Sequence, residues 1–535
     1  MVPKLVSRFQ LVEEESPEGY REFHYKDRPL NLSVLLDETA ARWPDEIAFV
    51  DGDRRITYRE FLNCVNRISA GLQKKWGIQK GDRVALLLGI GLPFCLAYFG
   101  AVRLGAIVVP LNTRYKGEEL VYEINDSGAK VLIADRPFYE TLAPVQDRMK
   151  AVSSVFINDG APPSGTLSFD ILTSYESDDF DPPHVSEWDI LNILYTSGTT
   201  GKPKGAMQTH RGIIGTAMMT HEFLNYQHGR DKVLCVIPLF HTTGLSMNLL
   251  ASVYGGVPVV FMNKFHPEEA LKLIQKERIT RMVAVIAVYW LMLNHQNFDQ
   301  YDLSSLREIL YGGSPAAEDV IREMRQKLPG VILHNGYGLT ETHAYDTHLP
   351  DEDAISHVES VGKILPLVEM KVVDFRGNEL SPGQIGELLI KGCKVVRGYW
   401  NRPEENRESF THGWLHTGDA ARIDENGYVY IMDRFKDMIN RGGEKIYSIE
   451  VENALYAYPK ILEAAVYGIP DEVFGEQVKA AVVVKPRASA TTEEIREFCA
   501  RRLADYKVPI EILFLDELPR NPAGKVVKGK LRERG

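Results

Sequence analysis

The sequence predicts a multi-domain α/β protein, with a large amino-terminal body and a smaller, mobile α+β domain at the carboxyl end. Three observations predict this class. The chain has 535 residues, of which 44% are hydrophobic, enough to bury several cores. Apolar strand-like runs alternate with amphipathic helical patterns over most of its length, as in layered α/β folds. Near residue 434 this pattern gives way to a charged stretch with two adjacent glycines, DRFKDMINRGGEKI, which is typical of a linker or hinge.

The body is expected to span residues 1–433 and to contain layers of sheets flanked by helices, together with a small β subdomain. Residues 84–102 carry no charge and imitate a membrane span. Glycines and a proline divide this run into the strand VALLL and the helix PFCLAYFGAVRLG, and the strand AIVVPL follows. Parallel strands covered on both faces give such runs, so we expect a buried βαβ unit and not an integral membrane protein.

A later helix of the body is predicted in SPAAEDVIREMRQKLPG. Ser314 can cap it, Pro315 suits its first turn, and the final Pro-Gly pair ends it. Its buried face is expected to hold Ala317, Val320, Ile321, Met324 and Leu328.

The carboxyl-terminal domain, residues 434–535, is expected to begin with a helix at Ser448. The strands AAVYGI and KAAVVVKP follow, then a helix opened by a capping box from Thr491 to Glu494, and then the strand IEILFL.

The composition argues against several kinds of binding partner and structural site. The chain has 62 basic and 73 acidic residues, a formal charge of −11, so we expect no nucleic-acid binding. Its five cysteines are dispersed without a C-x-x-C pair, which indicates neither a disulfide framework nor a zinc cluster. The amino terminus lacks the apolar core of a signal peptide. We therefore expect a cytoplasmic protein, and the sequence leaves open whether it is a monomer or a homodimer.

The stretch YTSGTTGKPKG has the composition of a phosphate-binding loop but does not fit the Walker A pattern. Thr196 stands where the first glycine is required, and Pro203 stands where the magnesium-binding hydroxyl is required. Four hydroxyls and two lysines among three glycines still indicate a loop that closes over a triphosphate.

The same loop resembles the signature of the adenylate-forming superfamily, which includes acyl-CoA synthetases, aryl-CoA ligases, beetle luciferases and the adenylation domains of peptide synthetases. Five further motifs stand in the family's order: YGGSPA at Tyr311, NGYGLTET at Asn335, WLHTGD at Trp414, DRFKDMINRGGEKI at Asp433 and PRNPAGKVVK at Pro519. The resemblance covers essentially the whole chain and implies an AMP-dependent acid–CoA ligase.

The resemblance implies a nucleotide site in which the ring of Tyr337 lies on adenine, and Asp419 and Arg434 hold the ribose. The full set implied to bind ATP or AMP is Thr196, Ser197, Gly198, Thr199, Thr200, Gly201, Lys204, Gly313, Ser314, Asn335, Gly336, Tyr337, Thr340, Asp419, Ile431, Arg434 and Lys525.

The residues implied to be catalytic are Lys525, Thr340, Glu341 and His241. Lys525 is expected to reach both the acid and the α-phosphate, and Thr340 to contact phosphate. Glu341 is expected to bind Mg²⁺, for which a carboxylate is a suitable hard ligand.

The implied acyl pocket contains His241, Val288, Tyr289, Gly312, Gly338 and His343. The sequence departs from the family pattern in two places, AVIAVYW at residues 284–290 and His343. The substrate of this chain therefore cannot be inferred from that of any one relative. Tyr289 either shortens the pocket or points into the core, and His241 lies either at the pocket mouth or among core hydrogen bonds. Members of the family that activate amino acids usually have an aspartate here, and residues 238–248 contain none, so the resemblance implies an acid without an α-amine. We expect a fatty, branched or aromatic carboxylic acid.

For the second half-reaction, the resemblance implies rotation of the carboxyl-terminal domain about a hinge at Lys436. Arg441, Gly442, Gly443 and Glu444 would then approach the channel for the thiol. We expect ATP, Mg²⁺ and CoA to be used. The alternatives are a stand-alone adenylating enzyme that loads a carrier-protein pantetheine, and a luciferase-like monooxygenase.

Overall fold

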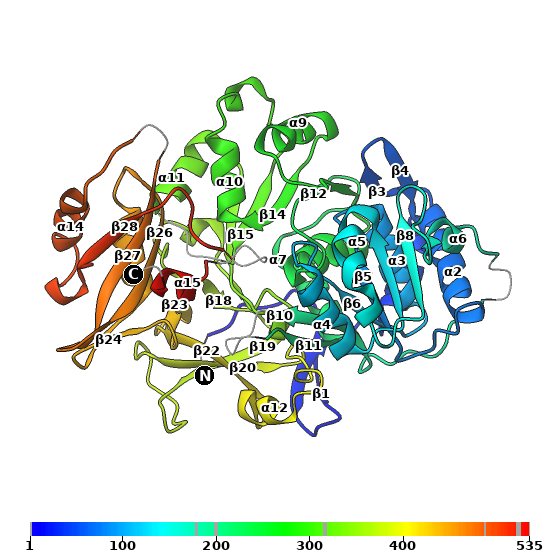
Figure 1. The fold of residues 1–535 in the computed structure, drawn as a ribbon, viewed down its shortest axis with the longest axis horizontal. Helices are drawn as coiled ribbons and strands as arrows, with labels where there is room; N and C mark the ends of the chain where they lie inside the picture. Colours follow the sequence, from blue (N-terminus) through cyan, green and yellow to red (C-terminus); the bar gives the residue numbers. More distant parts are fainter. Residues whose placement is uncertain are drawn as a thin grey trace.

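The computed structural model describes residues 3–176, 180–196, 202–313, 318–485, 488–520 and 526–533. Four large sheets organise these residues, and a short hairpin of β1 (Leu11–Glu15) and β2 (Arg21–Tyr25) precedes them. In Figure 1 the body occupies the centre and right, and the carboxyl-terminal domain, in orange and red, lies at the left. The expected α/β architecture with a separate carboxyl-terminal domain is confirmed.

The first large sheet has the strand order β11-β10-β6-β5-β7-β8-β9 and is parallel except where β10 pairs with β11. The expected βαβ unit is confirmed, since β5 and β6 are parallel neighbours joined by α3 (Leu92–Val102). The strands are β5 (Arg83–Leu87), β6 (Ile107–Pro110), β7 (Val131–Asp135), β8 (Ser154–Asn158), β9 (Leu167–Ser168), β10 (Ile190–Thr196) and β11 (Lys204–Thr209).

The second sheet has the order β16-β15-β14-β12-β13-β3-β4 and is parallel except for the β3–β4 pair. Its strands are β3 (Ile47–Asp51), β4 (Arg54–Thr57), β12 (Val233–Cys235), β13 (Val259–Phe261), β14 (Arg281–Val285), β15 (Glu308–Gly312) and β16 (Ile332–Gly336).

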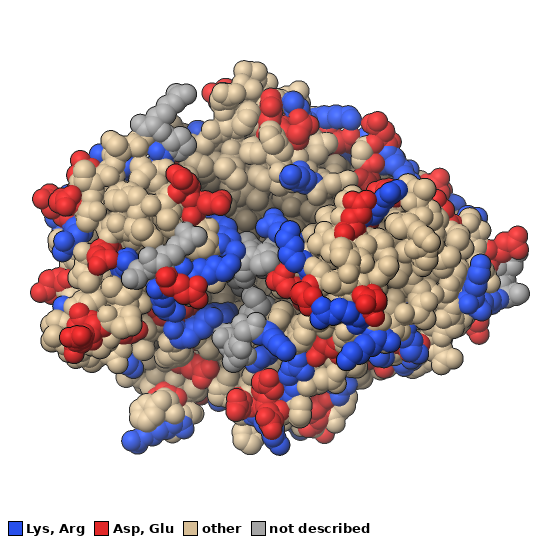
Figure 2. Space-filling model, in the orientation of Figure 1, with Lys and Arg blue, Asp and Glu red and all other residues tan. Residues whose placement is uncertain are grey.

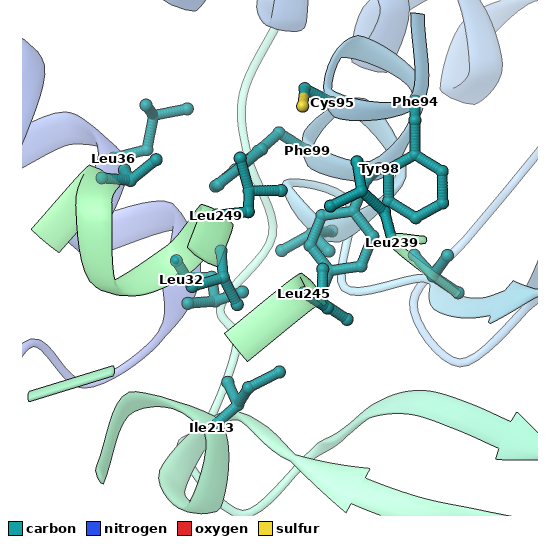
Figure 3. Packing of buried hydrophobic residues seen from close by; sticks show 14 of the residues in the cluster. Leu32, Leu36, Phe94, Cys95, Tyr98, Phe99, Ile213, Leu239, Leu245 and Leu249 are labelled. Atoms are coloured by element: carbon teal, nitrogen blue, oxygen red, sulfur yellow. The ribbon is translucent and has the colours of Figure 1, made fainter. Parts of the chain in front are cut away.

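A shared layer of helices lies between these two sheets. Alternate residues of a strand face opposite sides of its sheet, so one strand contributes to two cores. Val84 and Leu86 belong to the core between the sheets, whereas Ala85 and Leu87 belong to a separate core on the outer face. Figure 3 shows α1, α3, α7 and η2 contributing aliphatic and aromatic side chains to the shared core. The inner elements are α1 (Leu32–Arg42), α2 (Tyr58–Lys74), α3, α7 (His210–Phe223), the π-helix η2 (Thr243–Leu250) and α8 (Ala251–Gly255).

Outer helices cover the remaining faces. They are α4 (Gly117–Ser127) and α5 (Arg136–Leu142) on the first sheet, and α9 (Pro267–Glu277), α10 (Ile286–Leu293) and α11 (Glu318–Lys327) on the second. Helix α11 is the one expected from residue 314 onward, and Ile321, Met324 and Leu328 are buried as predicted while Val320 is half-buried. The expected cap at Ser314, with Pro315 and Ala317, lies outside the described residues. Within the described ranges, every helix is too short or too polar to span a bilayer.

The third sheet is antiparallel and forms the expected β subdomain of the body. Its strands are β17 (Thr347–His348), β18 (Gly362–Ile364), β19 (Val368–Val373), β20 (Gly386–Gly392), β21 (Phe410–Thr411), β22 (Trp414–Ile423) and β23 (Tyr428–Arg434), with α12 (Pro403–Ser409) beside them.

The carboxyl-terminal sheet contains β24 (Ile439–Arg441), β25 (Glu444–Ile446), β26 (Ile461–Asp471), β27 (Gly475–Val484) and β28 (Glu511–Phe514). The predicted helix from Ser448 is α13 (Ser448–Tyr456), and the predicted capping box opens α14 (Thr492–Ala500). A short helix, α15 (Lys528–Arg532), ends the chain's described part. Within the stretch expected to be a linker or hinge, β24 and β25 form a hairpin around Gly442 and Gly443, whose φ values are +61° and +94°.

Candidate active site

Several of the predicted site residues that the structure describes lie where the carboxyl ends of parallel strands meet the antiparallel sheet. Strands β15 and β16 end side by side at Gly312 and Gly336, and residues 337–341 follow directly. Open α/β sheets bind ligands at this edge. Figure 2 shows a hollow between the body and the carboxyl-terminal domain with Lys and Arg side chains around it, although the whole chain is acidic.

Asp419 holds two of the predicted nucleotide-binding residues together. The Tyr337 hydroxyl donates to its Oδ2 at 2.6 Å, and the Arg434 Nε lies 2.9 Å from its Oδ1. Strand pairing produces this arrangement, because Asp419 of β22 stands opposite Arg434 of β23. Burial, and then the adjacent Asp419 carboxylate, raises the pKa of Tyr337 well above its usual range, so its hydroxyl stays protonated. Ile431 packs with Tyr337 in the same apolar cluster.

Glu341 receives a hydrogen bond from a residue that sequence reasoning missed. The Tyr399 hydroxyl donates to its Oε1 at 2.9 Å. Tyr399 is brought there by backbone pairing with Ala206 of β11, and the Lys204 Nζ lies 5.4 Å from the centre of its ring. Burial, and then Glu341, raises the pKa of Tyr399, which therefore stays a donor.

This donor set fits Mg²⁺. One carboxylate with a fixed orientation is sufficient for a cation that takes most of its ligands from phosphate and water. The Tyr399 bond fixes the orientation of the Glu341 carboxylate, which would hold the metal. No cluster of three or more His, Cys, Asp or Glu with metal-binding geometry occurs in the part of the chain that the structure describes.

A buried polar chain links the predicted phosphate contact to the predicted acyl pocket. Gln208 Nε2 donates to the Thr340 carbonyl at 3.1 Å and lies 3.3 Å from the Thr242 hydroxyl, while its own Oε1 accepts from Asn192. Thr242 follows His241 at the start of η2. No sequence motif points to Gln208, because an isolated glutamine in a strand normally indicates an exposed side chain.

The predicted glycines stand where backbones approach closely. A Cβ on Gly312 would lie 2.4 Å from the Gly336 carbonyl oxygen, and one on Gly338 would lie 2.2 Å from the Tyr345 nitrogen. Gly313 has a φ of +78°, which side chains rarely adopt. Asn335 is buried in β16, where its Nδ2 lies 3.4 Å from the Ser360 carbonyl oxygen.

The six predicted acyl-pocket residues do not all come together. Tyr289 takes the core position of its two alternatives, since its hydroxyl donates to the Leu310 and Met282 carbonyls on the outer face of the second sheet. Val288 is buried in the same outer core. His241 lies on the inner side at the start of η2, with its ring 4.6 Å from that of Phe240.

His343 is fully buried and packs against Gly212 of α7. Its Nδ1 lies 2.6 Å from the Lys394 carbonyl oxygen. Burial lowers the pKa of His343 to about 3, so the ring is neutral at physiological pH.

The predicted hinge and thiol-channel residues follow the end of β23. Lys436 is exposed in a turn. Arg441 donates from Nε to Gln477 at 2.7 Å and covers the Phe474 ring at 4.1 Å, so it packs within its own domain. Gly442, Gly443 and Glu444 are exposed at the tip of the β24–β25 hairpin.

Thr196 ends β10, where its hydroxyl lies 3.4 Å from the Lys204 carbonyl oxygen. The loop between them, and two further predicted residues, lie outside the described residues: Ser197, Gly198, Thr199, Thr200, Gly201, Ser314 and Lys525.

The family model described as AMP-binding enzyme matches residues 36–400, and that of the AMP-binding enzyme C-terminal domain matches residues 450–525. A long-chain-fatty-acid–CoA ligase of Mycobacterium tuberculosis is 36% identical, with 94% of this chain and 98% of the relative covered.

Two solved structures of an o-succinylbenzoate CoA synthetase from Bacillus subtilis are also similar. The complex with the acyl-adenylate intermediate is 31% identical, with a TM-score of 0.83 over 93% of this chain and 97% of the other. The complex with ATP and a magnesium ion is 32% identical, with a TM-score of 0.82 over 93% of this chain and 99% of the other.

Proposed function

Because this chain belongs to the AMP-binding enzyme family and is an acid–thiol ligase, we propose that it joins a fatty acid to CoA through an acyl-adenylate, with ATP and Mg²⁺. The observation that supports the nucleotide site most directly is the convergence of Tyr337, Arg434 and Asp419 beside Glu341. The fatty-acid assignment rests on the long-chain-fatty-acid–CoA ligases among its relatives.

In the proposed first step, a carboxylate oxygen of the acid attacks the α-phosphorus of ATP. A new P–O bond forms, the bond to the β-phosphate oxygen breaks, and pyrophosphate leaves. Both reactants are anions, so the step requires fixed positive charge and N–H donors near the phosphates. We assign this role to Lys525, with Lys204 and the Thr340 hydroxyl in support. Magnesium, when bound to Glu341, would neutralise phosphate charge.

In the proposed second step, the CoA thiol displaces AMP from the acyl-adenylate, its sulfur bonding to the acyl carbon as the C–O bond to AMP breaks. We assign the change between steps to rotation of residues 434–535 about Lys436, which withdraws Lys525 and brings in the Arg441–Glu444 hairpin. The Asp433 carboxylate accepts from the Ser448 nitrogen at 2.5 Å across this hinge, so the proposed rotation would have to change this contact.

Acid-dependent exchange of labelled pyrophosphate into ATP tests the first step, and CoA-dependent release of AMP tests the second. We expect both, with saturated fatty acids as substrates. AMP release with a loaded carrier protein but not with CoA would favour a carrier-loading enzyme, and light with luciferin would favour a monooxygenase. Absence of exchange with every acid would refute the proposal. The cytoplasmic location stays a prediction.

A further inference from the structure

Helix α4 lies beside β10 and β11 (Figure 1) and contacts the predicted phosphate-binding stretch, residues 195–205, on both sides of its loop. Asp126 Oδ2 accepts a hydrogen bond from the Tyr195 hydroxyl at 2.8 Å, near the end of β10. The Tyr122 hydroxyl donates to the Pro203 carbonyl oxygen at 3.1 Å, just before β11. Burial, and then the nearby Asp126 carboxylate, raises the pKa of both tyrosines above its usual value, so both hydroxyls stay donors.

Arg402 joins these two contacts into one network. Its Nη2 donates to the Tyr122 hydroxyl at 2.6 Å and to Asp126 Oδ1 at 2.9 Å. Each oxygen of the Asp126 carboxylate therefore has its own donor. The side chains of Arg402 and Asp126 are only 21% and 13% exposed, so solvent and salt screen this ion pair less than a pair on the open surface.

The neighbours of Arg402 attach the same segment to α4. Trp400 Nε1 and Asn401 Nδ2 donate to the Asp126 carbonyl oxygen at 3.1 and 3.2 Å. The Trp400 nitrogen also donates to the Gly205 carbonyl oxygen of β11 at 2.8 Å. Asp126 therefore fixes residues 400–402 through its carboxylate and through its carbonyl oxygen.

Tyr399 directly precedes this segment, and its hydroxyl donates to Glu341, the predicted metal ligand. One network of hydrogen bonds thus reaches from both sides of the phosphate-binding loop to the residue that orients Glu341. A loop that binds a triphosphate and a carboxylate that binds its magnesium must keep one relative geometry, because a shift of about 1 Å can lower a rate roughly 100-fold.

We propose that Asp126, together with Tyr122 and Arg402, is a positioning residue of the adenylation step, which holds the phosphate-binding loop and the Tyr399–Glu341 pair in one arrangement for ATP and Mg²⁺. This inference rests on the proposed function and adds residues to it that act on ATP only through the groups they hold.

The first test measures the Kd for ATP and the Kd for AMP by calorimetry, in the absence of acid. In Asp126→Asn the ion pair with Arg402 is lost, and the Kd for ATP should rise about tenfold or more, as expected for a lost hydrogen bond to a charged group. AMP lacks the two outer phosphates, so its Kd should stay near the wild-type value. A general loss of structure would weaken both nucleotides alike.

The second test is a double-mutant cycle with Tyr399→Phe, read as the Mg²⁺ concentration that half-saturates pyrophosphate exchange. Asp126→Asn alone should raise this concentration. The combined variant should raise it by less than the product of the two single effects, because both substitutions act on the orientation of Glu341. Two effects that multiply would overturn the link from Asp126 to Tyr399.

Asp82 offers a matched control. It pairs with Lys130 at 2.7 Å, and its side chain is 13% exposed, like that of Asp126. It precedes β5, at the amino end of the same sheet, whereas the phosphate-binding loop follows the carboxyl end of β10. Asp82→Asn should leave both Kd values and the Mg²⁺ dependence unchanged.

If Asp126→Asn does not fold, Tyr122→Phe gives a milder test, because it removes only the hydroxyl that reaches Pro203. The Kd for ATP should then rise about two- to tenfold, the range for a hydrogen bond between neutral groups, with the Kd for AMP unchanged. A folded variant with the wild-type Kd for ATP, or with equal weakening of ATP and AMP, would overturn the inference. Absence of pyrophosphate exchange by the wild-type protein with every acid would instead refute the proposed function.

Discussion

The hydrogen bond from Tyr399 to Glu341 gives the sharpest test of the proposed metal site. Tyr399→Phe removes only the hydroxyl and keeps the ring that packs near Lys204. A hydrogen bond to a charged group contributes about 1.5–3 kcal/mol, which corresponds to roughly 10- to 150-fold in rate. We expect kcat/KM for pyrophosphate exchange to fall by this amount, because the Glu341 carboxylate loses its fixed orientation.

Dependence on magnesium separates this role from a general structural one. Exchange is measured over a range of Mg²⁺ concentrations at saturating acid. We expect the half-saturating concentration to rise in Tyr399→Phe, and high Mg²⁺ to restore part of the lost activity. Thioester formation from supplied acyl-adenylate should remain near the wild-type rate, since that step does not use the pyrophosphate-bound metal.

Tyr428, the first residue of β23, offers a matched control. The Tyr428 hydroxyl donates to Asp353 at 2.6 Å, the same kind of bond outside the proposed site. Tyr428→Phe should leave the magnesium dependence unchanged. Tyr399→Phe with wild-type kcat/KM at every Mg²⁺ concentration would refute the assignment of Tyr399 as the residue that orients Glu341.

Three further outcomes are expected. Lys525→Ala should slow adenylation on the order of 10²- to 10³-fold while leaving thioester formation from supplied acyl-adenylate largely intact; equal loss of both steps would contradict the rotation proposal. Asp419→Asn should raise KM for ATP at least about tenfold in the exchange assay without a comparable change in KM for the acid, because the ribose loses a charged acceptor. The urea concentration at the unfolding midpoint should decrease as the pH is lowered from 7.5 to 5. A midpoint that does not change with pH would contradict this expectation. Burial lowers the pKa of five described histidines below the unfolded value near 6.5, so each costs up to about 1.4 kcal/mol per pH unit as pH falls through that value. They are His24, His210, His221, His343 and His348.

Elements with a strong local pattern could be predicted from the sequence. The βαβ unit around α3 and the capping box of α14 were both predicted, because each depends on residues close together in the chain. The hairpin of β24 and β25 lies in a stretch whose charge and glycines predict a linker or hinge, although adjacent glycines between two short strands are also a known turn signal. The charged residues on both sides of Gly442 and Gly443 obscured the alternation, since β25 lies at the edge of its sheet.

Site residues could be predicted where one motif contains the chemistry, as with Tyr337 and Glu341. Tyr399 could not, because it reaches Glu341 only after residues 397–400 have paired with β11. Tyr289 remained ambiguous for a related reason. An apolar helix such as α10 gives no amphipathic pattern, and which of its residues faces the sheet is decided by packing.

Lys394 shows most clearly what could not be predicted from the sequence, because a lysine normally indicates an exposed position. Here its charge is fully buried, and a buried ion pair is weak evidence for stability, since desolvation offsets most of the attraction. Its geometry explains its presence better: three bonds fix two carbonyls and one carboxylate of a segment whose backbone would otherwise relax out of the left-handed region. The conformation of residues 343–345, and with it the Tyr345 ring, therefore depends on a residue about 50 positions away. A relative with a different residue at position 394 would hold this segment differently, so similarity in the motifs around Glu341 does not by itself carry a substrate from one relative to another.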